Sequence, residues 1–259
     1  MIRAPRPLDR VADAGLWVAL AVGLLPLAGI AWFVAGRLPA VWSAGPGLAA
    51  AVRGSLFVLG IGMAVAVPTG VCGGIWVAEV RGGWLAWWVR LSAELLAGAP
   101  GVIVGYAALF ALVDGLGWGF GTAAGGLALA AVMLPQMVRD TAAAVAAVPD
   151  RLRDASLALG VDRRGTAWRL VVPAAAPRIL AGVLNAVGVG IGETAALACT
   201  LGWTGIGGAG RSYLTRAIWA AARRPDVGAA ALVVVVAVVL VARALSGVAG
   251  GGGGRGRVG

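Results

Sequence analysis

The sequence lacks histidine and lysine altogether, so its 21 basic residues are all arginine. Without lysine, a phosphate-binding loop ending in Gly-Lys-Ser or Gly-Lys-Thr is excluded, and with it this way of holding ATP. Without histidine, the chain lacks the most common general base and metal ligand. Cysteine is scarce too, and Cys72 and Cys199 lie in separate apolar runs, which favours buried thiols over a disulfide or a metal site. We therefore expect no catalytic site, no metal and no cofactor bound by this chain.

Charged residues make up only 12% of the chain, whereas 60% of the residues are hydrophobic. Soluble domains carry about a quarter charged residues, so this composition indicates a membrane protein. Several apolar runs reach the roughly 18 residues that a helix needs to cross a bilayer. The sequence therefore predicts an all-α polytopic membrane protein with about six transmembrane helices. We place these helices near residues 16–35, 55–78, 91–113, 122–138, 179–201 and 227–242.

The arginines are distributed unevenly between the segments that join these helices. If the N-terminus is inside, most arginines fall in inner segments, above all in the loop 139–178. Because arginine-rich loops stay on the cytoplasmic side, we expect both termini to be cytoplasmic. We divide the chain into three parts. Residues 1–47 hold a cytoplasmic segment, the first helix and an outer loop, residues 48–245 form the transport domain, and residues 246–259 are a flexible glycine-rich tail.

The loop 139–178 contains signals for two short helices separated by a sharp turn. Pro149 and Asp150 mark a helix start, with Asp150 as the N-cap. Gly160 stands where a helix ends in a left-handed conformation, and Asp162 can cap a second helix that Pro173 interrupts. Along the first helix, a small and apolar stripe is formed by Leu152, Ala155, Ser156 and Leu159.

An apolar stripe on a loop surrounded by water needs a surface to pack against. That surface can be the chain's own transmembrane helices or a partner protein. An ordinary charged cytoplasmic loop, with no docking role, is the alternative that the pattern leaves open.

The spacing of this loop resembles the signature of bacterial ABC-importer permeases of the MetI-like superfamily. That signature reads Glu-Ala-Ala, three residues, Gly, nine residues, Ile-x-Leu-Pro. Here Asp154, Ala155 and Ser156 are followed by Gly160, and then by Leu170, Val172 and Pro173 at the matching positions. The resemblance implies that the first helix is a coupling helix that docks on a separate ATPase. It implies contacts through Asp154, Ala155, Ser156 and Gly160, with rim charges at Arg151, Arg153, Arg163 and Arg164.

Three further stretches, residues 66–82, 96–106 and 190–197, are similar to permeases of Pst-type phosphate importers. The Gly-Glu-Thr-Ala element at residues 192–195 and the stretch 223–240 look more like their A-type than their C-type subunit. The resemblance implies a location in the bacterial plasma membrane and a second, C-type permease subunit. It also implies an ATPase dimer that uses ATP and magnesium, and an extracytoplasmic phosphate-binding protein. The chain itself would supply a path and mechanical coupling, and bond-making chemistry would lie in the partner.

Candidate path residues lie in two apolar segments. Glu193, followed by Thr194, is an acidic residue well inside a predicted helix, and ionisable groups at that depth are costly and are candidates for function. Gly98, Pro100 and Gly101 break the third helix and would leave a helix N-terminus free to face an anion. Close helix packing is the alternative reading of these glycines.

An ionised Glu193 would repel an anion such as phosphate, so the identity of the substrate is left open. The related permeases commonly carry an arginine four residues before this glutamate, where this chain has Val189. A partner charge would then come from the second permease or from a residue such as Arg178. An importer for sulfate, molybdate or tungstate therefore remains an alternative to a phosphate importer. A secondary transporter or a membrane enzyme is favoured less, because clustered charges are absent from the apolar runs.

Overall fold

The computed structural model describes residues 45–79, 83–202 and 225–251, together with a few single residues outside these ranges. The described part is helical and contains no strand, which confirms the all-α prediction. The first predicted transmembrane helix lies outside the described residues. The helices are α3 (Gly45–Glu79), α4 (Trp84–Ala97), α5 (Gly101–Ala108), α6 (Thr122–Ala146), α7 (Asp150–Ala158), α8 (Arg163–Thr166), α9 (Val172–Gly192), α10 (Ala195–Leu201) and α12 (Pro225–Gly251), with π-helical turns η1 (Leu109–Gly115) and η2 (Ala167–Val171).

Within the described residues, three helical segments are long and apolar enough to cross a membrane: Leu48–Glu79, Arg163–Gly192 and Ala230–Ala249. A fourth candidate is the pair Trp84–Ala97 and Gly101–Gly115, which is bent by 108° at the predicted break. Its N-terminal half ends at Gly98, and Pro100 is the N-cap of α5. The interruption of the third apolar run is therefore confirmed, while the count of about six helices stays a prediction.

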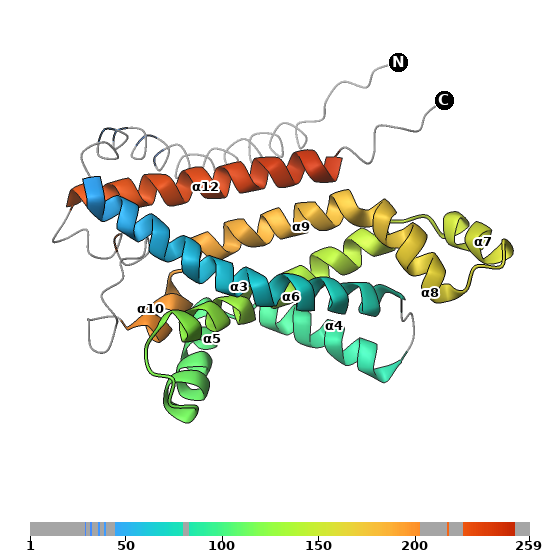
Figure 1. Cartoon of the computed structure of the whole chain (residues 1–259), viewed down its shortest axis with the longest axis horizontal. Helices are drawn as coiled ribbons and strands as arrows, with labels where there is room; N and C mark the ends of the chain where they lie inside the picture. The colour runs from blue at the N-terminus through green and yellow to red at the C-terminus, as the bar shows by residue number, and fades with distance from the viewer. Residues whose placement is uncertain are drawn as a thin grey trace, which may run out of the picture.

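The centre of the molecule is the contact of α6 with α3 and α9 (Figure 1). A buried apolar cluster joins these helices through Val58 and Ala66 of α3, Leu129 and Met133 of α6, and Ala186 of α9. Helix α9 also packs along α12. Among the other elements, α7 and α8 lie at the right of Figure 1 and α5 and α10 at the left, while α4 lies below α3 and α6.

Helices α3 and α6 approach closely because small residues recur along α3 at a spacing of four: Gly62, Ala66, Gly70 and Gly74. A Cβ atom on Gly74 would lie 2.7 Å from the Val138 carbonyl oxygen and 2.5 Å from the Thr141 Cβ of α6. A Cβ atom on Gly62 would lie 3.2 Å from the Gly126 carbonyl oxygen. Small residues in such rows let membrane helices pack backbone to backbone.

Two helix ends differ from the sequence expectation. Pro173 does not interrupt the second helix of the loop, because α8, η2 and α9 run on as one helical segment from Arg163 to Gly192. Pro173 lies in the first turn of α9, directly after the π turn η2. The first turn of a helix tolerates a proline, and the wider π turn changes the hydrogen-bond register where the proline has no N–H. Helix α12 continues to Gly251, beyond residue 246, where we expected the tail to begin.

Candidate functional site: the α7 docking element and the Glu193 break

The turn after α7 has the geometry that its sequence predicts. Gly160 has a φ of 81°, in the left-handed region. Its N–H donates to the Leu157 carbonyl oxygen at 2.9 Å, and the Val161 N–H donates to the Ser156 carbonyl oxygen at 3.2 Å. These two bonds form a Schellman motif, which satisfies the last carbonyl groups of the helix and turns the chain sharply.

The start of α7 differs from the prediction by one residue. Pro149 is the N-cap, and Asp150 is the first residue of the helix rather than its cap. No side chain caps this end. Asp150 still stabilises the helix, because a carboxylate in the first turn interacts favourably with the positive end of the helix dipole.

Helix α8 is capped as predicted and is tied to α7. The Asp162 Oδ1 atom accepts a hydrogen bond of 3.1 Å from the Gly165 N–H. The Ser156 hydroxyl of α7 lies 2.9 Å from the hydroxyl of Thr166, which is buried. The turn and this hydroxyl pair fix the angle between the two short helices.

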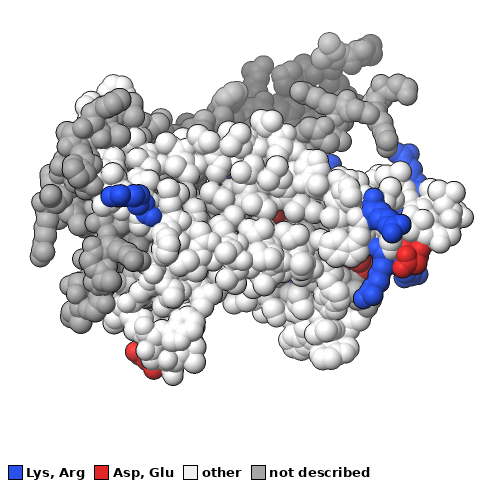
Figure 2. Space-filling model, in the orientation of Figure 1, with Lys and Arg blue, Asp and Glu red and all other residues white. Residues whose placement is uncertain are grey.

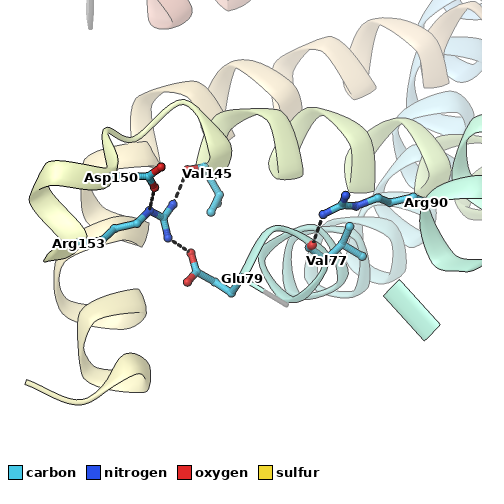
Figure 3. Close-up of polar contacts among 6 residues, drawn as sticks. All are labelled: Val77, Glu79, Arg90, Val145, Asp150 and Arg153. Atoms are coloured by element: carbon cyan, nitrogen blue, oxygen red, sulfur yellow. Dashed lines mark hydrogen bonds and ion pairs between the residues drawn. The ribbon is translucent and has the colours of Figure 1, made fainter. Parts of the chain in front are cut away.

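Arg153 lies on the inner side of α7 and contacts three other residues (Figure 3). Its Nη1 atom forms an ion pair with Oε1 of Glu79, the last residue of α3. Its Nη2 atom donates to the Val145 carbonyl oxygen of α6 at 2.9 Å, and its Nε lies 3.6 Å from Asp150 Oδ1. Arg153 is therefore buried against the chain's own helices, which differs from the rim position expected for it.

The outer side of α7 is exposed. Leu159 is 85% exposed, and Arg151, Asp154, Ala155 and Gly160 are exposed as well. The predicted stripe is thus divided: Leu152 and Ser156 are half-buried, while Ala155 and Leu159 face outward. A second exposed apolar side chain, Trp168, lies on η2.

Figure 2 shows that most charged side chains on the visible face gather at the right, the end formed by α7 and α8. One basic and one acidic group lie at the left, and the middle of this face is almost free of charge. The exposed charged residues of α7, α8 and the turn between them are Asp150, Arg151, Asp154, Asp162, Arg163 and Arg164. Helix α7 therefore presents a mixed apolar and charged surface outward and keeps a polar anchor inward.

At the other end of the molecule, Glu193 lies in the break between α9 and α10. The backbone is extended there, with φ −73° and ψ 113°. The Glu193 Oε1 atom accepts hydrogen bonds from the N–H groups of Ala195 at 2.9 Å and Ala196 at 3.1 Å. The carboxylate thus satisfies free N–H groups at the start of α10, with Thr194 as the N-cap.

The structure brings the broken third segment to the same place. A Cβ atom on Gly101 would lie 2.6 Å from both carboxylate oxygens of Glu193, so the start of α5 touches this carboxylate. One turn later, a Cβ atom on Gly105 would lie 2.6 Å from Cα of Ala196. Gly101 and Gly105 therefore serve the close packing of α5 on α10, and Gly101 also borders the Glu193 carboxylate.

Among the described residues, the Glu193 carboxylate is paired with backbone N–H groups, those of Ala195 and Ala196. No ion pair between Glu193 and an arginine is found among the described residues, Arg178 included. The N–H groups at a helix start carry partial positive charge, so they stabilise the carboxylate without an arginine.

Sequence reasoning missed a polar contact between α6 and α9. The Asp140 carboxylate accepts hydrogen bonds from Asn185 Nδ2 at 3.1 Å and from Gln136 Nε2 at 2.8 Å. We expected the fourth helix to end near residue 138, which placed Asp140 in the loop. The polar residue Asn185 within an apolar run was the signal that could have revealed this contact. Among the described residues, no cluster of side chains could hold a metal ion.

Comparisons with known proteins identify the family of the chain. Residues 70–248 match the family model described as "Binding-protein-dependent transport system inner membrane component". The chain is 38% identical over 163 residues to the probable ABC transporter permease protein YqgI of Bacillus subtilis, a match that covers 62% of this chain and 55% of that protein. It is 34% identical over 244 residues to the phosphate transport system permease protein PstA 2 of Mycobacterium bovis, covering 86% of this chain and 81% of that protein.

Among solved structures, a chain of the MetNI methionine ABC transporter in an inward-facing conformation has the same fold. The TM-score is 0.62 at 18% identity, and the match covers 84% of this chain and 99% of that chain. The family model spans more than half of the sequence, and the match to PstA 2 extends over most of both proteins. The chain therefore belongs to the binding-protein-dependent transport system inner membrane components, the MetI-like permeases of ABC importers.

Proposed function

We propose that the chain is the A-type permease subunit of an ATP-driven phosphate importer. The proposal is supported by the relatives that are described as phosphate transport permeases in mycobacteria. In this proposal the chain pairs with a C-type permease and receives phosphate from an extracytoplasmic binding protein. A separate ATPase dimer uses ATP and magnesium, and the chain itself binds no cofactor. Both termini face the cytoplasm of a bacterial cell, as the arginine distribution predicts.

The observation that carries the coupling function is the two-sided environment of α7. Its inner side is held by Arg153 and Ser156, while Asp154, Ala155 and Leu159 remain exposed. A helix that is fixed on one side and open on the other can be gripped by a partner without losing its own packing. Docking of an ATPase on the outer side of α7 would bury the exposed leucine and place partner charges beside Asp154 and Arg151.

The translocation path in this proposal passes the Glu193 break. The path residues are Glu193, Thr194, Gly98, Pro100 and Gly101, where two helix starts, those of α5 and α10, meet one carboxylate. Because backbone N–H groups balance the carboxylate charge, an ionised Glu193 need not exclude an anion from this region. Movement of α9 would shift this carboxylate against α5 and α10.

Uptake measurements test the substrate. In cells that lack their own importers, the chain is expressed with its partner subunits, and radiolabelled phosphate, sulfate and molybdate are compared at equal concentration. We expect ATP-dependent uptake of phosphate at least ten times faster than that of the other two anions. Preferred uptake of sulfate or molybdate would contradict the phosphate proposal while leaving the importer function in place.

A further inference from the structure

Arg153 is the one charged residue that the described part of the chain buries, with 9% of its surface exposed. Its guanidinium reaches residues of three helices: Glu79 of α3, Val145 of α6 and Asp150 of α7 itself. Arginine suits this position because its planar fork can donate in several directions at once while it stays charged. A surface charge that serves only solubility would not be turned inward and paired in this way.

The contacts of Arg153 lie at helix ends. Glu79 is the last residue of α3, and the Val145 carbonyl belongs to the last turn of α6. The end of α3 is held a second time, because Arg90 of α4 donates to the Val77 carbonyl oxygen at 2.7 Å (Figure 3). Arginines near helix C-termini satisfy free carbonyl groups and interact favourably with the negative end of the helix dipole.

We propose that Arg153 is a positioning residue that joins the docking helix α7 to the ends of α3 and α6. The covalent routes from α7 lead back through residues 147–149 into α6 and onward through α8 and η2 into α9, and neither leads directly into α3. Arg153 adds a direct connection to the end of α3 and also braces α7 against the last turn of α6, and the glycine-lined contact of these two helices makes them one tight pair. Displacement of α7 by the ATPase then moves α3 and α6 together with α9. This inference rests on the proposed coupling function and concerns how motion leaves the docking helix.

The connection that Arg153 makes from α7 to α3 and α6 is called the joint below. A double-mutant cycle tests the joint in the complete importer, reconstituted in proteoliposomes with its ATPase and binding protein. Arg153→Ala and Glu79→Ala are each expected to lower phosphate uptake at least tenfold, while the ATPase co-purifies at the parent level. The double variant is expected to be no worse than the poorer single variant, because Glu79→Ala removes only the ion pair that Arg153→Ala also removes. The proposal would be overturned if the fold-losses of the two single variants multiply in the double variant. It would also be overturned if either single variant takes up phosphate within twofold of the parent rate.

Variants that keep the bulk of the side chains guard against a folding defect. Arg153→Lys keeps the charge but loses the fork, and Glu79→Gln keeps an acceptor oxygen but loses the charge. We expect both to insert normally and to reduce uptake several-fold, and normal uptake in both would overturn the joint. Arg243→Ala is the matched control, since Arg243 is an exposed arginine on α12, and its uptake should equal that of the parent.

A thiol probe separates this inference from the choice of substrate. In a Cys72→Ala background, Cys199 on α10 reports on the region beside Glu193. ATP with vanadate should change its labelling rate in the parent complex and change it far less in Arg153→Ala. If the parent shows this change, Arg153→Ala shows far less of it, and neither takes up phosphate, the substrate proposal has failed while the role of Arg153 stands. An equal change in both proteins, or none in the parent, would overturn the joint.

Discussion

Gly160 shows how one residue can decide the direction of the docking helix. With its φ of 81°, it occupies a conformation that costs other residues roughly 1–2 kcal/mol, and more for a β-branched one. A Cβ atom there would meet nothing within 4 Å, so the penalty is conformational rather than steric. We expect Gly160→Val to abolish ATP-driven uptake, because the turn would open and α7 would point elsewhere, while the protein still inserts in the membrane.

Uptake and membrane content, measured side by side, check this expectation. Gly160→Asn is the matched control, since asparagine tolerates the left-handed conformation better than other residues with a side chain. It should keep most of the uptake. Equal losses in both variants would mean that the space around Gly160, rather than its conformation, matters for docking.

Glu193 supports a second prediction at this scale. Its Oε1 atom accepts hydrogen bonds from two backbone N–H groups at the start of α10. Losing a side chain that caps a helix start in this way typically costs about 1 kcal/mol of stability. Glu193→Ala should therefore lower the free energy of unfolding by about that amount, whereas Glu193→Gln, which keeps an acceptor oxygen, should lower it less. Chemical unfolding in detergent, followed by tryptophan fluorescence, measures both. Equal stability of the Ala variant and the parent would show that the two hydrogen bonds contribute little.

Residues governed by local rules were predictable from the sequence. Gly160 and Asp162 follow from capping preferences, which depend on a few neighbouring residues. The partner of Arg153 was not predictable, because Glu79 is 74 residues away in the sequence and meets it only through the packing of α3 and α6. For the same reason the sequence suggested an arginine for Glu193, while the structure supplies backbone N–H groups from the following helix.

Among the elements, α3 and α6 form the most extensive contact of the described residues, and glycines bring the two helices close together. A Cβ atom on Gly74 would lie 2.5 Å from the Thr141 Cβ and 2.7 Å from the Val138 carbonyl oxygen, and backbone cannot easily move aside. We expect Gly74→Ala to destabilise the protein by about 1–3 kcal/mol, the usual range for overpacking. The thermal midpoint in detergent should fall accordingly.

Gly60 provides the control on the same helix. A Cβ atom there would meet nothing within 4 Å, and alanine favours a helix over glycine by up to about 1 kcal/mol. Gly60→Ala should therefore leave the midpoint unchanged or raise it. A similar decrease in both variants would argue against a specific close contact at Gly74.

The sequence pattern predicted where the helices lie better than where they end. Hydropathy located the apolar runs, and glycine and proline located the break before α5. The continuous helix through Pro173 was not foreseen, because a π turn depends on how the surrounding helices hold the chain. Charged residues after residue 138, such as Arg139 and Asp140, likewise hid the true length of α6, because the sequence does not show that Asp140 is paired with Gln136 and Asn185.

For the whole molecule, the important feature is the distance between its two functional ends. The docking element and the Glu193 break are connected by the helical segment Arg163–Gly192, whose 30 residues span about 45 Å. Such a helix transmits displacement along its length, so movement at the charged end in Figure 2 can reach the break between α9 and α10. The exposed side of α7 is the surface through which a partner would apply that displacement.

The outer side of α7 can accordingly be altered without affecting the fold. Leu159 is already 85% exposed, so Leu159→Asp should change the free energy of unfolding by no more than about 0.5 kcal/mol. If the ATPase covers this leucine, its loss removes roughly 1.5–3 kcal/mol of apolar burial, which corresponds to about a ten- to hundredfold weaker complex. Co-purification of the ATPase and uptake should fall together, in contrast to Arg153→Ala, where co-purification persists. An ATPase that remains bound to Leu159→Asp at the parent level would show that it docks elsewhere, and α7 would then lose its assigned role.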